Sequence, residues 1–174
     1  CGLGMGQISE KILKNVLKKV SCPCVIDADG LNLLSRNIEL LNQCCAPVIL
    51  TPHMKEMSRL TGWSIDTIME DRFQALDQII KQSGPDTKSS IICVLKDSRT
   101  VVAQTNRQKF VNIAGNPSMA KGGSGDVIAG TIAGLLAQHM APFEATTVGV
   151  FLHACGGDEA KKSKGSYSVL ARDL

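Results

Sequence analysis

Aromatic residues are scarce in this sequence: one tryptophan, one tyrosine and four phenylalanines occur among 174 residues. Single-strand nucleic-acid binding proteins stack bases on aromatic side chains. A basic block is missing as well, since the formal net charge is only +3. No apolar run reaches the length of a membrane-spanning helix, and no signal peptide is recognisable. We therefore expect neither nucleic acid nor membrane as a partner, and we expect a cytoplasmic protein.

The cysteine pattern indicates neither disulfides nor a metal site. The chain has seven cysteines, an odd number, and no secretory signal accompanies them, which predicts reduced thiols packed in the core. Cys22 and Cys24 are separated by one residue, and Cys44 and Cys45 are adjacent. Neither spacing matches a zinc ribbon.

The sequence does contain the elements of one α/β domain. With 174 residues, 44% of them hydrophobic, the chain can bury a single core. Short apolar runs alternate with helical periodicity, which predicts a mostly parallel, doubly wound sheet with helices on both faces. Strands are expected at 23–26, 46–50, 90–95, 100–103 and 109–112, and helices at 8–20, 31–34, 54–60, 64–83, 127–138 and 142–162.

Two of the predicted helices carry clear apolar stripes. The helix at 64–83 has Ser64 as a plausible N-cap and is expected to stop at the turn residues 84–86. Its core stripe comprises Ile65, Ile68, Met69, Phe73, Leu76, Ile79 and Ile80. In the helix at 8–20, one face is formed by Ile8, Ile12, Leu13, Val16, Leu17 and Val20.

The segment 112–139 is the most informative one, because a glycine-rich loop leads directly into an apolar helix. Gly122, Gly123, Ser124 and Gly125 stand at the junction. The first N–H groups of a helix have no intrahelical partner, and glycine lets a ligand approach the backbone. A phosphate group can therefore dock here without a lysine. Asp126 follows in the first turn, either as an acid stabilised by the helix dipole or as a general base beside the anion.

Polar residues follow several predicted strands, at the sheet edge where α/β proteins bind ligands. Asp27 and Asp29 come after the first strand and can hold a metal or ribose hydroxyls, or Asp29 can cap the next helix. His53 follows the second strand, as a cap, a packed residue or a ligand contact. Lys96 follows the third, as an exposed turn residue or a phosphate contact. His153, in the last helix, is expected to be packed in the core.

The residue order is more specific than these patterns. The string N-x-x-G-N-x-x-M-A-x-G-G-x-G-D at 112–126 resembles the signature of the ADP/ATP-dependent NAD(P)H-hydrate dehydratases. The segments V-I-D-A-D-G-L-N, I-L-T-P-H-x-x-E and L-K-x-x-x-T, and the glycine loop at Gly2, resemble other motifs of that family. Asp97 stands where the family usually has glycine, which places a negative charge near the expected phosphates.

The resemblance implies a ribokinase-like fold and repair of hydrated nicotinamide cofactor. ADP or ATP would phosphorylate the hydroxyl of the NADH or NADPH hydrate, with Mg²⁺ on the polyphosphate, and phosphate would then leave. Asp126 would be the catalytic base. The substrate would contact Gly2, Asp27, His53, Asn116 and Asp126, and the nucleotide would contact Lys96, Thr100, Gly122, Gly123, Ser124 and Gly125.

Three further expectations accompany the resemblance. The family's domain has βα units before the glycine cluster at Gly2, so we expect residues 1–174 to form a single domain that begins mid-domain. The family tends to form homo-oligomers. Two alternative functions remain open at this stage: a small-molecule kinase of the same superfamily, and a remnant without catalytic activity.

Overall fold

The apolar runs of the sequence form one mixed sheet. The computed structural model describes residues 1–81, 90–105, 107 and 109–174. Five strands lie in chain order across the sheet. The first three pair in parallel, and the last two add to them antiparallel. The strands are β1 (Cys24–Ile26), β2 (Val48–Leu50), β3 (Ile91–Leu95), β4 (Val101–Gln104) and β5 (Phe110–Val111).

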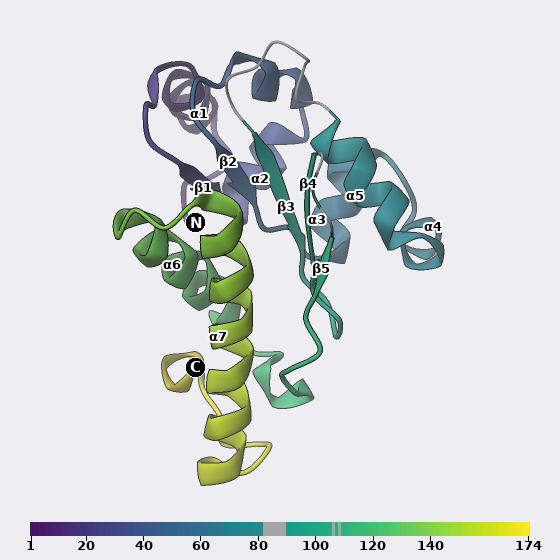
Figure 1. Cartoon of the computed structure of the whole chain (residues 1–174). Helices are drawn as coiled ribbons and strands as arrows, with labels where there is room; N and C mark the ends of the chain where they lie inside the picture. Colours follow the sequence, from purple (N-terminus) through teal and green to yellow (C-terminus); the bar gives the residue numbers. More distant parts are fainter. Residues whose placement is uncertain (82–89, 106, 108) are drawn as a thin grey trace.

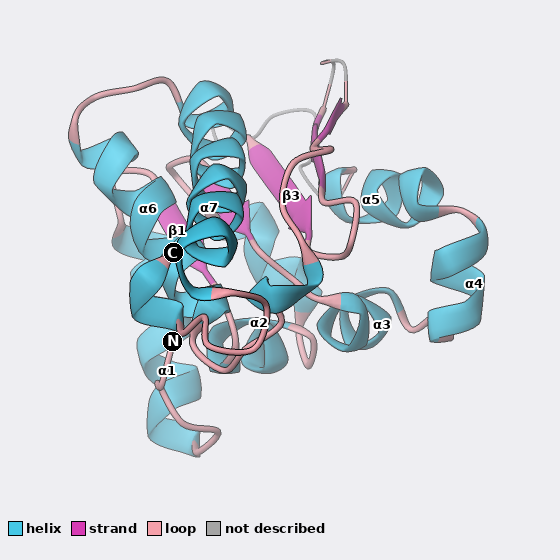
Figure 2. Cartoon of the chain, turned by 90° about the horizontal axis from the view of Figure 1, so that it is seen from below, coloured by secondary structure: helices cyan, strands magenta, loops and turns pink. Residues whose placement is uncertain are grey.

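Helices cover both faces of this sheet (Figure 1, Figure 2). Because strand order follows chain order, right-handed crossovers place the helices between β1 and β3 on one face. These are α2 (Asp29–Leu34), the 3₁₀ helix η1 (Ile38–Gln43), α3 (Met54–Thr61), α4 (Ile65–Glu70) and α5 (Arg72–Ile80), and α1 (Gln7–Lys19) packs on the same core. The opposite face is covered by α6 (Ser124–Ala137) and α7 (Pro142–Lys164). Two short 3₁₀ helices, η2 (Pro117–Met119) and η3 (Ala171–Asp173), complete the chain.

Strand β2 shows how the alternation of side chains divides the core. Val48 and Leu50 belong to the larger hydrophobic cluster, together with α1 to α5. Ile49, between them, belongs to the smaller cluster with Ile128 and Ile132 of α6. Side chains on a strand alternate between faces, so β1 to β4 each contribute to both cores. The predicted doubly wound arrangement with helices on both faces is thereby confirmed.

The prediction of one long helix at 64–83 is wrong, because the chain forms α4 and α5 with a break at Asp71. The Asp71 carboxylate accepts a hydrogen bond from Gln74 N at 2.9 Å and caps α5. An aspartate that caps a new helix competes with helix continuation. Of the predicted stripe, Ile65, Met69 and Phe73 are exposed. Ser64 caps α4 as expected, whereas the predicted stop at 84–86 lies outside the described residues.

Three other expectations need correction. Helix α1 buries only Leu13 and Leu17 of its predicted face, and Ile8 is 76% exposed. The cysteines are all free, but Cys44 and Cys93 alone are fully buried. Helix α6 begins three residues earlier than the predicted Val127.

Among the described helices, none combines the length and apolar character that a membrane crossing requires.

Ala28 has a backbone conformation that alanine rarely adopts. Its φ of 50° and ψ of −116° match the first central position of a type II′ turn, which favours glycine. The turn is closed by a hydrogen bond of 3.0 Å from Gly30 N to Asp27 O. This strained turn connects β1 to α2 and begins at Asp27.

We expect Ala28→Gly to leave the free energy of unfolding unchanged or to raise it by about 1 kcal/mol, because relief of strain outweighs the added entropy of the unfolded chain. The measurement is urea denaturation. Ala133→Gly, at an exposed position inside α6, is the matched control and should lower stability by about 1 kcal/mol. Equal losses in the two variants would contradict the assignment of strain to Ala28.

Candidate active site

The carboxyl ends of the three parallel strands meet at Asp27. Thr51 Oγ1, after β2, donates to Asp27 Oδ1 at 2.8 Å, and Lys96 Nζ, after β3, lies 2.8 Å from the same oxygen. Asp27 is only 4% exposed and the Lys96 side chain 19%. The predicted convergence of polar strand ends is therefore present, and it takes the form of a largely buried ion pair.

The first turn of α6 lies next to this ion pair. A β-carbon added at Gly125 would stand 3.3 Å from Lys96 Nζ and 3.5 Å from Asp27 Oδ2. Gly123 has a φ of 92°, and within the described chain no side chain caps the α6 N-terminus. We call the backbone of residues 122–125 the anion cup. Within the described chain, the N–H groups of Gly122, Gly123 and Gly125 have no hydrogen-bond partner, whereas Ser124 N donates to Lys121 O at 3.2 Å. Together with the neighbouring Lys96 ammonium, these free N–H groups are a favourable setting for phosphate.

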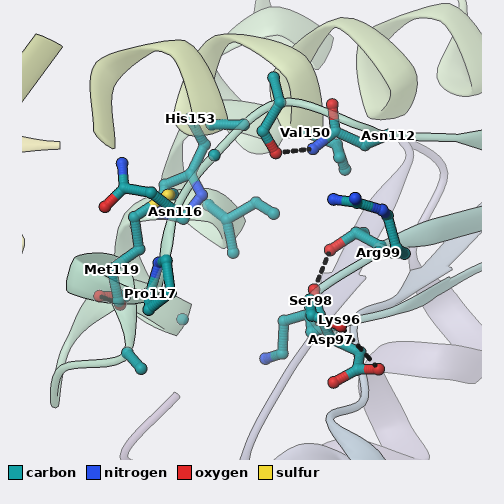
Figure 3. A pocket seen from close by; sticks show the side chains of 18 of the residues that line it. Lys96, Asp97, Ser98, Arg99, Asn112, Asn116, Pro117, Met119, Val150 and His153 are labelled. Carbon is teal, nitrogen blue, oxygen red and sulfur yellow. Dashed lines mark hydrogen bonds between the residues drawn. The ribbon is translucent and has the colours of Figure 1, made fainter. Parts of the chain in front are cut away.

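A cavity of about 900 Å³ opens beside the anion cup (Figure 3). One wall is the turn 96–100 between β3 and β4, and another is the loop 112–121. The remaining walls come from Ser124, Gly125 and Ile128 of α6, from Val150, His153 and Ala154 of α7, and from His53. This volume lies within the usual range for small-ligand sites.

The cavity separates the predicted site residues into two groups. Six of them line it: His53, Lys96, Thr100, Asn116, Ser124 and Gly125. The other five, Gly2, Asp27, Gly122, Gly123 and Asp126, are not part of its lining. Asp126 is exposed, and its carboxylate forms a group with Asp27 and Cys1 in which the potential ligand atoms lie within 4.8 Å of one another. Asp126 therefore faces the ion pair from the outer side of the anion cup.

The N-terminal glycine loop is held near this group. Asp29 Oδ2 accepts a hydrogen bond of 2.9 Å from Gly4 N, and Cys1 Sγ lies 3.7 Å from Asp27 Oδ2. Asp29 makes no cap for α2, so the alternative of an N-capping role is wrong. The same contacts bring Gly2 to the vicinity of Asp27.

His53 caps α3. Its Nδ1 accepts hydrogen bonds from Lys55 N and Glu56 N at 3.1 and 3.2 Å, and Glu56 in turn accepts from His53 N. Because Nδ1 acts as an acceptor, the ring proton of the neutral imidazole resides on Nε2. Half of the His53 side chain remains exposed, and the residue also lines the cavity. The capping role and a ligand contact are compatible.

Asn116 has its side chain fully engaged within the protein. Its Nδ2 donates to Gly157 O at 2.9 Å and to Asp158 Oδ1 at 2.8 Å, while its Oδ1 accepts from Ser118 N at 3.1 Å. Asp158 also accepts from Gly115 N at 3.0 Å. The hydrogen bonds from Asn116 and Gly115 hold the pKa of Asp158 below its ordinary value. The cavity wall formed by this loop is thus fixed to α7.

Asp97, where glycine is usual in the family, does not leave a free negative charge in the cavity. Its Oδ2 lies 2.8 Å from Arg72 NH2 of α5. Arg72 and Asp158 both support the site from distant helices, and no motif in the sequence marked them. Only the tertiary structure brings them to these loops.

His153 lines the cavity instead of lying entirely in the core, so its predicted placement is wrong in part. Burial is the main cause of a lowered pKa of His153. A hydrogen bond to the Ser124 backbone raises this pKa, and the nearby Lys96 ammonium lowers it further. Its Nε2 is buried and has no hydrogen-bond partner among the described residues. His153 therefore packs behind the first turn of α6, with its ring at the border between the core and the cavity.

Comparison with known proteins gives one consistent family. The model of a family described as NAD(P)H-hydrate dehydratase matches residues 1–174. A bifunctional NAD(P)H-hydrate repair enzyme of Moorella thermoacetica is 38% identical over 99% of the chain, which spans 32% of that relative. An ADP-dependent (S)-NAD(P)H-hydrate dehydratase of Neisseria meningitidis is 39% identical over 95% of the chain, which spans 55% of it. The chain thus covers between a third and somewhat more than half of these relatives.

Solved structures agree with this result. An ADP/ATP-dependent NAD(P)H-hydrate dehydratase from Bacillus subtilis, co-crystallised with ATP and Mg²⁺, superposes with a TM-score of 0.81 at 28% identity, covering 99% of this chain and 58% of that one. A ribokinase-like superfamily protein from Enterococcus faecalis gives a TM-score of 0.76 at 34% identity, covering 98% and 56%. The expected ribokinase-like fold is confirmed.

We expect Gly125→Ala to weaken pyrophosphate binding by about tenfold or more, because the new methyl group would occupy the anion cup beside Lys96. Isothermal titration calorimetry measures this. Gly130→Ala, in the same helix with open space around it, is the control and should bind like the wild type. Gly130→Ala should gain stability, since alanine favours helix, whereas in Gly125→Ala the crowding of Lys96 and Asp27 offsets that gain. Unchanged binding in Gly125→Ala would contradict the location of the anion cup.

Proposed function

Because the chain belongs to the NAD(P)H-hydrate dehydratase family, we propose that it catalyses the nucleotide-dependent dehydration of NADH hydrate or NADPH hydrate back to NAD(P)H. The observation that carries the proposal is the uncapped N-terminus of α6, where the anion cup lies next to Lys96 at the edge of the cavity, with Asp126 beside it. The anion cup can receive a phosphoryl group, the cavity can hold its donor, and Asp126 can act as the general base.

The chemistry is a phosphoryl transfer followed by an elimination. Asp126 takes the proton of the substrate hydroxyl as the oxygen attacks the terminal phosphorus, and the bond to the leaving nucleotide breaks. The N–H groups of Gly122, Gly123 and Gly125 stabilise the charge on the transferring group, and Ser124, whose N–H donates to Lys121 O, lines the nucleotide site. The carbon–oxygen bond then breaks and inorganic phosphate leaves, the adjacent ring carbon releases a proton to solvent, and the carbon–carbon double bond of the dihydronicotinamide ring is restored. With ADP as donor the products are AMP, phosphate and NAD(P)H.

The carboxylates of Asp27 and Asp126 suit a magnesium ion that travels with the polyphosphate. Thr51 and Lys96 occupy Oδ1 of Asp27, and the Asp126 carboxylate lies within 4.8 Å of the Asp27 carboxylate. Oxygen donors of this kind are what Mg²⁺ prefers. When bound, the ion would neutralise charge on the phosphates.

We assign the remaining roles as follows. Lys96 and Thr100 contact the nucleotide together with the anion cup, and the hydrated nicotinamide contacts Gly2, Asp27 and His53. Asn116 contributes through the shape of the cavity wall, because its side chain is already satisfied. ADP is the proposed donor, in line with the name of the Neisseria meningitidis relative, and ATP is the alternative. A cytoplasmic homo-oligomer is part of the same proposal.

Product analysis tests the reaction type. Incubation with ADP or ATP, Mg²⁺ and NADH hydrate should restore the near-ultraviolet absorbance of NADH and release inorganic phosphate. A stable phosphorylated small molecule without recovered absorbance would instead indicate a kinase of the same superfamily. A folded protein that binds neither ADP nor ATP would indicate a remnant without catalytic activity.

Asp126→Asn should lower turnover by roughly 10²- to 10⁴-fold, because the amide cannot accept the proton, while the affinity for ADP in the absence of Mg²⁺ stays within a small factor of wild type. Steady-state kinetics and calorimetric ADP titration measure the two effects. Asp66→Asn removes a first-turn carboxylate of α4 far from the site and serves as the control. Full turnover in Asp126→Asn would refute its role as the base.

A further inference from the structure

The cavity lacks the aromatic platform on which many proteins stack a nucleobase. Among the described residues that line it, there is no phenylalanine, tyrosine or tryptophan. The wall near α6 and α7 is instead aliphatic, with Ile128, Val150 and Ala154. A planar base could pack against this wall on one side. Its other side would need a different planar group, and an arginine guanidinium can provide one through stacking and cation–π attraction.

Arg99 is placed to be that group. It lines the cavity from the turn between β3 and β4, and Figure 3 shows its guanidinium extending toward Asn112, on the side of the cavity opposite Met119 and Asn116. Within the described chain, Arg99 has no hydrogen bond, ion pair or ring contact. The nearest carboxylate in sequence, Asp97, is held by Arg72 at 2.8 Å. Arg99 is therefore available to a ligand.

Lys96 and Arg99 lie at opposite ends of the same turn. Lys96 Nζ is next to the anion cup and bonded to Asp27. Arg99 adjoins Thr100, whose carbonyl accepts a hydrogen bond of 2.9 Å from Asn112 N at the end of β5. A nucleotide with its phosphates at the cup and Lys96 would extend along the turn and carry its base past Arg99.

We propose that Arg99 determines nucleotide affinity by stacking its guanidinium on the nucleobase of the donor, with the base held against the aliphatic wall of α6 and α7. This inference rests on the proposed function, since it assumes that a nucleoside polyphosphate occupies the cavity. It assigns Arg99 to base recognition and leaves charge neutralisation of the phosphates to Lys96 and the anion cup.

Calorimetric titration of wild type, Arg99→Ala and Arg99→Lys with ADP and with pyrophosphate tests the proposal. We expect both variants to bind ADP about tenfold more weakly than wild type, because lysine keeps the charge but not the plane. Pyrophosphate has no base, so its affinity should change less than about twofold in Arg99→Lys. Arg36→Ala, at an exposed arginine paired with Glu10 outside the cavity, is the control and should bind both ligands normally.

Each alternative outcome is distinct. Normal ADP affinity in Arg99→Lys, together with equal losses of ADP and pyrophosphate affinity in Arg99→Ala, would make Arg99 a phosphate-binding cation and overturn the proposal. Wild-type ADP affinity in Arg99→Ala would overturn it as well, while the proposed function stands. Absence of binding of both ADP and ATP by the wild type would refute the proposed function itself. Thermal unfolding of the variants should match wild type, because Arg99 has no partner in the described chain to lose.

Discussion

The ion pair between Asp27 and Lys96 is the interaction on which the site depends. It joins the ends of β1 and β3, and Thr51 from β2 completes it through the same carboxylate oxygen. Loss of one partner of a buried pair leaves an uncompensated charge, at a cost of about 3–5 kcal/mol. The pair thus holds three strands in register at their carboxyl ends. The same contact sets Lys96 beside Gly125, so the geometry that closes the sheet edge also prepares a binding site for phosphate.

A second set of contacts fixes the opposite wall of the cavity. Asp158 of α7 accepts hydrogen bonds from the backbone of Gly115 and from the side chain of Asn116. The neighbouring Gly157 leaves room for Met119, because a β-carbon added at Gly157 would stand only 2.3 Å from the Met119 sulfur. The loop 112–121 is therefore attached to α7, while the turn 96–100 on the other side is tied to the sheet through the bond from Lys96 to Asp27. The cavity lies between two rigid supports, which suits a site that must position a donor and an acceptor.

The parts of this site that local rules govern were predictable from the sequence. Asp27, Thr51 and Lys96 could be placed together because parallel strands end at one edge, and Gly125 could be placed at a helix start because the loop chemistry changes there. Arg72 and Asp158 could not, since they reach the site from helices whose sequence carries no signal of the contact. The break at Asp71 was missed for a related reason: apolar periodicity continues through it, and capping by the aspartate overrides the period.

His53 and Asn116 show what residue order alone leaves undetermined. Both stand in motifs that imply substrate contacts, yet the structure uses His53 Nδ1 to cap α3 and every polar atom of the Asn116 side chain to fix a loop. His53 Nε2 lies 3.5 Å from Glu56 Oε1 but makes no hydrogen bond within the described chain, so it can still donate to a ligand. Asn116 retains no free side-chain donor or acceptor of comparable quality. Its presence in the motif is accounted for by the wall that it builds, and direct recognition in this part of the cavity falls to the backbone and to neighbouring side chains.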